Sequence, residues 1–185
     1  MPIINSEEGE REGIMQVSRL MLVSARTAPK SGGVDDILTA LVSGKEKESL
    51  AKEMEKIGEE RSISGFERDA GNTRNSEAVV LIGVRGTKKY GLNCGACGYV
   101  DCDEFEKAEK KTGQDFTGST CVFKALDLGI AVGSAVKTAS ILNVDNRIMY
   151  RIGAAARRLN MMSEASVIMG IPVSAKGKNI YFDRK

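Results

Sequence analysis

The sequence predicts an α+β domain that carries a metal-binding loop between a strand and a helix. Two observations lead to this prediction. Short, continuously apolar runs, which are typical of buried strands, alternate with longer segments of helical period. In addition, three of the four cysteines lie between the clearest apolar run, residues 78–84, and a long apolar segment at 120–142, and the fourth, Cys121, lies at the start of that segment. We interpret residues 1–185 as one domain, with residues 90–121 as an inserted metal-binding motif.

The first part of the chain alternates between helix and strand. Residues 10–28 have apolar side chains at helical spacing, and Pro29 with the glycines after it ends this helix. Residues 37–42 form a short apolar run, which we interpret as a buried strand, although such a run can also be helical. Residues 45–61 are highly charged with one apolar stripe, which is typical of a surface helix. The polar stretch at 64–75 is a connection with room for another short helix.

The clearest strand is at residues 78–84, where an almost continuously apolar sequence suits a central strand covered on both faces. Beyond the cysteines, residues 120–142 predict a long helix that is apolar on nearly every side and is therefore expected to be central. Gly129 and Gly133 lie on one face of this helix and would let another backbone approach closely.

The last two predicted elements are a helix and a strand. Residues 147–159 have helical spacing, and Asp145 or Asn146 is the expected N-cap. Residues 165–170 are the third predicted strand. Mixed helices and strands in this order are the basis of the α+β assignment.

The cysteines form one group, Cys94-x2-Cys97-x4-Cys102, followed by Cys121 after eighteen residues, and the chain has no histidine. Four thiolates without imidazole are the ligand set of an iron–sulfur cluster or a structural zinc. The spacing favours a cluster, because zinc bound by four cysteines usually has two short C-x2-C pairs and this sequence has only one. Zinc and a disulfide are the alternatives.

Composition restricts the partners and the compartment. Lys and Arg number 27 and Asp and Glu 25, so the net charge of +2 provides no strong field for nucleic acid or an anionic membrane. No secretory signal is evident in residues 1–13, and the uncharged stretch at 128–136 is too short to span a bilayer. We therefore expect a cytoplasmic protein without nucleic-acid or membrane partners. Its expected partner is a redox protein or a small-molecule electron donor.

The cysteine segment resembles the small four-iron domain of electron-transport and corrinoid iron–sulfur proteins. The similar residues run from Cys94 to Cys102 as C-G-A-C-G-Y-V-D-C, with the aromatic Phe105 three positions later and Cys121 last. Together with residues 24–30 and 170–179, this motif also resembles an uncharacterised family that carries a ferredoxin-type domain. The resemblance implies one 4Fe-4S cluster with the ligands Cys94, Cys97, Cys102 and Cys121.

A weaker resemblance links the wider chain to flavin-dependent nitroreductases. The turn from Arg26 to Ser31 is similar to the end of their early helix, and residues 125–134 are similar to their central helix. This resemblance implies a nitroreductase-like α/β sandwich, a homodimer, and FMN at the dimer interface. The FMN phosphate needs fixed positive charge. The candidate contacts are Arg26, Lys176 and Lys178.

Three functional hypotheses follow. The first is a 4Fe-4S redox protein that passes electrons between its cluster and FMN as an oxidoreductase. The second is a non-enzymatic electron carrier or docking subunit without flavin, because the N-terminal R-x-S-x-R segment that grips the FMN phosphate in nitroreductases is absent here. The third is a structural zinc protein or a cluster-based sensor. No catalytic acid or base is assigned.

Overall fold

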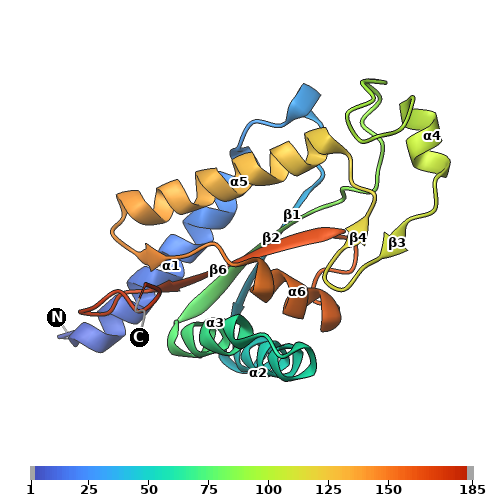
Figure 1. Cartoon of the computed structure of the whole chain (residues 1–185). Helices are drawn as coiled ribbons and strands as arrows, with labels where there is room; N and C mark the ends of the chain where they lie inside the picture. The colour runs from blue at the N-terminus through green and yellow to red at the C-terminus, as the bar shows by residue number, and fades with distance from the viewer. Residues whose placement is uncertain (1–2, 183–185) are drawn as a thin grey trace.

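A four-stranded antiparallel sheet forms the centre of the computed structural model, which describes residues 3–182. Its strands, in spatial order, are β1 (Ile37–Ser43), β2 (Ala78–Val84), β6 (Val167–Ser174) and β5 (Asp145–Asn146). Helices cover both faces of the sheet (Figure 1). The α+β class and all three predicted strands are therefore confirmed.

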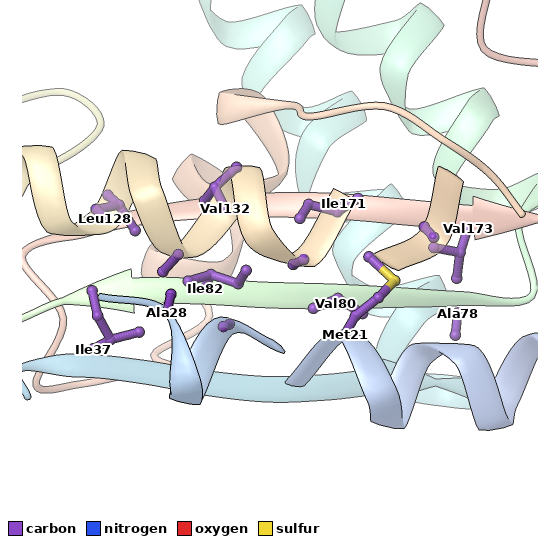
Figure 2. Close-up of a cluster of buried hydrophobic side chains, with 14 of the residues drawn as sticks. Met21, Ala28, Ile37, Ala78, Val80, Ile82, Leu128, Val132, Ile171 and Val173 are labelled. Atoms are coloured by element: carbon purple, nitrogen blue, oxygen red, sulfur yellow. The ribbon is translucent and has the colours of Figure 1, made fainter. Parts of the chain in front are cut away.

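The first face of the sheet is covered by α1 (Ser6–Thr27) and α5 (Val122–Ile141), which pack against each other and against the strands. Figure 2 shows the apolar core between them, where Met21 of α1 lies beside Val80 of β2 and Leu128 of α5 belongs to the same cluster. The predicted early helix is confirmed and begins four residues sooner, because the side chain of Asn5 caps it by accepting a hydrogen bond from the Glu8 N–H.

The second face is covered by α2 (Gly44–Arg61), α3 (Ser64–Asn75) and α6 (Tyr150–Arg158). Alternate residues of a strand point to opposite faces, and all seven residues of β2 are buried. Thus β2 contributes to a core on each side of the sheet, which confirms it as the central covered strand. The polar connection after the charged helix is itself a full helix, α3.

The surroundings of α5 differ from the prediction. The helix buries one side only, and its outward side exposes Leu126 by 54% and Ile130 by 45%. Within residues 3–182, no heavy atom outside the helix lies within 4 Å of a Cβ built on Gly129 or Gly133. The expectation that α5 is central is therefore wrong for the described chain, because apolar sequence on every side does not reveal which sides the same chain covers. The close approach that Gly129 and Gly133 would allow stays a prediction.

The start of α6 also differs. Asp145 and Asn146 do not cap the helix but pair with Ser174 and Val173 as strand β5. Met149 forms a bridge with Gly170, so the helix begins only at Tyr150. Pairing with β6 satisfies these backbone groups and outweighs the local capping preference of Asp and Asn.

The segment between β2 and α5 holds α4 (Cys102–Lys107) and a hairpin of β3 (Lys111–Thr112) and β4 (Thr117–Gly118). It lies at one end of the sheet (Figure 1). Two arginines attach the hairpin to helices of the second face. Arg61 forms an ion pair with Asp115 at 2.6 Å, and Arg157 donates to the hydroxyls of the paired threonines at 2.9 Å. Among the described residues, no helix has the length and apolar character needed to cross a membrane.

Candidate metal centre

All four cysteines lie in the segment that joins β2 to α5. Cys94 and Cys97 are in the loop before α4, Cys102 is the first residue of α4, and Cys121 directly precedes α5. All four are free thiols. Cys94 is exposed, Cys97 is half-buried, and the other two are buried. No disulfide forms, so all four sulfurs remain available as ligands.

Cys102 is held by two hydrogen bonds from one residue, Asn93. The Asn93 N–H donates to Cys102 Sγ at 3.3 Å, and the Cys102 N–H donates to Asn93 Oδ1 at 2.9 Å. Gly95 and Gly98 have φ angles of +71° and +89°, which glycine adopts without steric cost. Glycine thus permits the tight turns that directly follow the first two cysteines.

Cys121 is attached to the end of the central strand. Its N–H donates to the carbonyl of Gly86 at 2.8 Å, and the N–H of Gly86 in turn donates to Ser166 Oγ at 2.9 Å. A Cβ on Gly86 would lie 2.6 Å from the Thr120 side chain, so the close approach requires glycine. The fourth cysteine is thus positioned by β2 and by the segment before β6.

Aromatic side chains shelter the inner side of α4. Phe105 is buried and packs edge-on against Tyr99, with ring centroids 5.6 Å apart. The Lys110 ammonium lies 3.8 Å from the Phe105 centroid, which is within the range of a cation–π interaction. The aromatic residue expected three positions after Cys102 is therefore buried on the inner side of α4, against Tyr99.

A buried ion pair lies one helical turn after Cys121. Lys124 is only 2% exposed and donates to the carboxylate of Asp36, which also contacts Lys88 at 3.5 Å. Burial by itself would raise the pKa of Asp36, but the hydrogen bond and charge of Lys124, with the charge of Lys88, hold that pKa below its usual value. Sequence reasoning missed this pair, although a lysine and an aspartate near the start of an otherwise apolar helical run are a signal of buried charge.

The structure does not bring the cysteines into a ready-made ligand set. Among residues 3–182, no group of three or more His, Cys, Asp and Glu side chains is arranged so that it could hold a metal ion. The residues present nevertheless fit a group bound by thiolates. They supply four free thiols, turns with positive φ angles, and a backbone N–H that donates to sulfur. The assignment of Cys94, Cys97, Cys102 and Cys121 as ligands stays a prediction.

The predicted flavin contacts are divided between the two ends of α1. Arg26, in the last turn, pairs with Asp35 at 2.5 Å and donates to the Ile37 carbonyl. Lys176 pairs with Glu77 at 2.9 Å and lines a cleft of about 1210 Å³ together with Arg11.

Arg11 and Arg26 are separated by about 22 Å along the helix, at 1.5 Å per residue. Arg26 and Lys176 therefore do not meet at one phosphate within a protomer. Lys178 lies two residues beyond Lys176, in the tail after β6. All three stay predicted contacts, and Arg11 is a cation in the same cleft that sequence reasoning did not select.

The fold is similar to those of solved nitroreductases and of an NADPH:FMN oxidoreductase. Nitroreductase CinD from Lactococcus lactis, in complex with chloramphenicol, matches with a TM-score of 0.59 at 12% identity over 95% of this chain and 81% of that chain. NADPH:FMN oxidoreductase from Vibrio harveyi, complexed with NAD+, matches with a TM-score of 0.55 at 12% identity over 100% of this chain. Nitroreductase A from Vibrio parahaemolyticus matches with a TM-score of 0.53 at 13% identity over 96% of this chain.

This chain spans only 65% and 61% of the two Vibrio proteins. The matches show the fold, and the predicted nitroreductase-like α/β sandwich is confirmed.

The sequence comparisons concern closer relatives. The model of a family described as "uncharacterized protein containing a ferredoxin domain" matches residues 117–184, a range that includes Cys121. An uncharacterized protein from Archaeoglobus fulgidus is 48% identical over 182 residues, which cover 98% of this chain and 97% of that protein. With this identity over nearly its whole length, the chain belongs to the family of uncharacterised proteins that contain a ferredoxin domain.

Proposed function

We propose that this redox protein binds one 4Fe-4S cluster through Cys94, Cys97, Cys102 and Cys121 and passes single electrons. The observation that carries the proposal is the presence of the entire cysteine complement as free thiols around one short segment, with an N–H donating to the Cys102 sulfur. The ferredoxin domain of the family and the nitroreductase-like fold both support redox chemistry. When bound, the cluster supplies one-electron transfer.

Charges around the cysteines would tune the cluster. Asp101, Asp103 and Glu104 place negative charge beside Cys102, which disfavours the addition of an electron and lowers the reduction potential. Lys89 offsets part of this effect, because its ammonium contacts Asp103 at 2.8 Å and Glu106 at 2.9 Å. The net direction expected from these residues is a low potential.

In the fuller form of the proposal, the cluster exchanges electrons with FMN bound at a dimer interface. Lys176 is a candidate phosphate contact in the cleft near the start of α1, where Arg11 adds positive charge. The other candidate, Lys178, follows it in the tail after β6. Arg26 lies at the other end of the helix, beside Asp35. The chain would then be an oxidoreductase, with the flavin linking one-electron and hydride transfer.

A flavin-free electron carrier or docking subunit is the second candidate. The observation that favours it is that Arg26 and Lys176 already have carboxylate partners within the chain, Asp35 and Glu77. A phosphate would have to compete with these carboxylates or displace them. Bound flavin in protein purified without air would exclude this candidate.

The deciding experiment is an absorption spectrum with iron, sulfide, zinc and flavin analysis on protein purified without air. About four irons and four sulfides per chain are expected from one 4Fe-4S cluster. FMN in addition would support the oxidoreductase, and the cluster without FMN would support the carrier. Zinc without sulfide would overturn the redox proposal and favour a structural zinc site.

The exposed side of α5 supports the proposed homodimer. Leu126, Ile130 and Ile141 are exposed along this side, and the glycines between them leave room for a second backbone. Replacing Ile130 by Glu places a charge in the apolar patch, so we expect this variant to be monomeric where the wild-type chain is dimeric. Sedimentation equilibrium at matched concentrations measures the difference.

The control for this prediction is Ile63→Glu. Ile63 is also an exposed isoleucine, but it lies between α2 and α3 on the second face. This variant is expected to keep the wild-type mass. A monomeric wild-type protein, or a dimer that survives Ile130→Glu unchanged, would contradict the assignment of this surface.

A further inference from the structure

We propose that Asn93 is the positioning residue that holds Cys102 in place as a cluster ligand, an inference that rests on the proposed function. Its backbone N–H donates to Cys102 Sγ at 3.3 Å, and its side-chain oxygen accepts from the Cys102 N–H at 2.9 Å. One residue therefore contacts both the sulfur and the backbone of the ligand. Asn93 has no thiolate, which is the usual ligand of an iron–sulfur cluster, so its role is to orient the cysteine.

The backbone conformation of Asn93 requires a particular residue type. Its φ angle is +51°, in the left-handed region that asparagine and glycine enter more readily than other residues. Glycine would tolerate this conformation but has no side-chain acceptor, whereas most other side chains would be strained there. Asparagine combines the left-handed backbone with a short amide, and the observed pair of hydrogen bonds uses both.

The Cys102 N–H depends on Asn93 because of its position in α4. The first N–H groups of a helix have no partner within the helix. The Asp101 carboxylate accepts from the N–H groups of Asp103 and Glu104, at 3.0 Å and 2.8 Å. The N–H of Cys102 is bonded instead to Asn93 Oδ1. Removing the Asn93 side chain therefore leaves the Cys102 N–H without this acceptor.

The same contact links two ligands. Asn93 directly precedes Cys94, so its bonds to Cys102 bring the start of the cysteine motif to the first turn of α4. Cys102 is buried and Cys94 is exposed, so the link joins an anchored ligand to one on the surface. We therefore expect Asn93 to govern how firmly the bound iron is retained.

The test uses three variants. Asn93→Gly keeps the left-handed backbone and loses the side-chain acceptor. Asn93→Asp keeps a side chain of the same length with an acceptor oxygen. Asn160→Gly is the matched control, because Asn160 is exposed and has a φ angle of +55° but lies after α6. The measured quantity is the rate of iron release from anaerobically prepared holoprotein to a ferrous chelator.

Asn93→Gly is expected to release iron about 10-fold to 100-fold faster than the wild type, the usual effect of losing a residue that orients a metal ligand. Asn93→Asp and Asn160→Gly are expected to stay close to the wild-type rate. Equal rates for Asn93→Gly and the wild type would overturn the proposal, as would an equal acceleration in Asn160→Gly.

A second readout separates this inference from the proposed function. In metal-free protein, alkylation of Cys102 is followed by peptide mass spectrometry. Asn93→Gly loses the hydrogen bond from the Cys102 N–H to Asn93 Oδ1, and this loss should speed alkylation of Cys102 about fivefold to tenfold. If the wild-type chain takes up no iron, the proposed function fails. The alkylation rate alone then decides whether Asn93 holds the Cys102 thiol. An unchanged alkylation rate in Asn93→Gly would overturn that role.

Discussion

Replacing Cys97 by Ser is expected to abolish the visible absorbance of the 4Fe-4S cluster or convert it to that of a smaller cluster. Serine keeps the size of the side chain but removes the thiolate that iron–sulfur clusters require. Cys97 is half-buried in the loop before α4 and has no disulfide partner, so its loss should leave the remaining fold intact. Iron and sulfide per chain, measured together with the spectrum, should fall in parallel.

Ala96→Ser is the matched control for this variant. Ala96 lies next to Cys97 in the same exposed loop, so a serine here tests the change in polarity without removing a ligand. It is expected to keep the wild-type spectrum. An unchanged spectrum in Cys97→Ser would contradict the assignment of this cysteine, whatever metal the protein holds.

Replacing Lys124 by Met is expected to lower the free energy of unfolding by about 3 kcal/mol, because removing one partner of a buried ion pair leaves the other charge uncompensated. Asp36 would retain only Lys88, whose side chain is 61% exposed and 3.5 Å away. Urea unfolding of the purified protein at pH 7 measures the change. Lys88→Met is the control and should cost less than about 1 kcal/mol, since its ion pair is largely solvated.

The same pair has a pH dependence with a defined sign. The folded-state pKa of Asp36 lies below its ordinary value of 3.8, so the stabilisation is complete above that pH and is lost as the pH falls through the folded pKa. Lys124→Met should lose this acid-dependent part. A double variant, Lys124→Met with Asp36→Leu, should recover much of the stability, because no buried charge is left unpaired. If Lys124→Met is as stable as Lys88→Met, the pair does not contribute as described.

Local patterns were sufficient to predict most elements of this fold. The apolar runs at 37–42 and 78–84 are strands because β1 and β2 must bury their side chains against helices on the sheet. The charged helix α2 was predicted from one apolar stripe, which lies in the second core. These signals act within a few residues, so they can be recognised without knowing the remaining chain.

Elements that depend on distant partners were predicted less well. Asp145 and Asn146 have the composition of a helix cap, yet they pair with β6, whose residues come nearly thirty positions later. The apolar character of α5 predicted a central helix, but the described chain covers only one side of it. Periodicity reports that a surface is apolar and does not report what covers it.

The sequence by itself determined which ligand chemistry is predicted for the site. Four clustered cysteines without histidine predict thiolate ligands, and their spacing favours a cluster over zinc, because residue type and short spacing act locally. Only the tertiary structure decided how Lys124 meets Asp36 across 88 positions, and that Arg26 and Lys176 lie at opposite ends of α1. Such contacts follow from the packing of whole helices against a sheet, which no local pattern encodes.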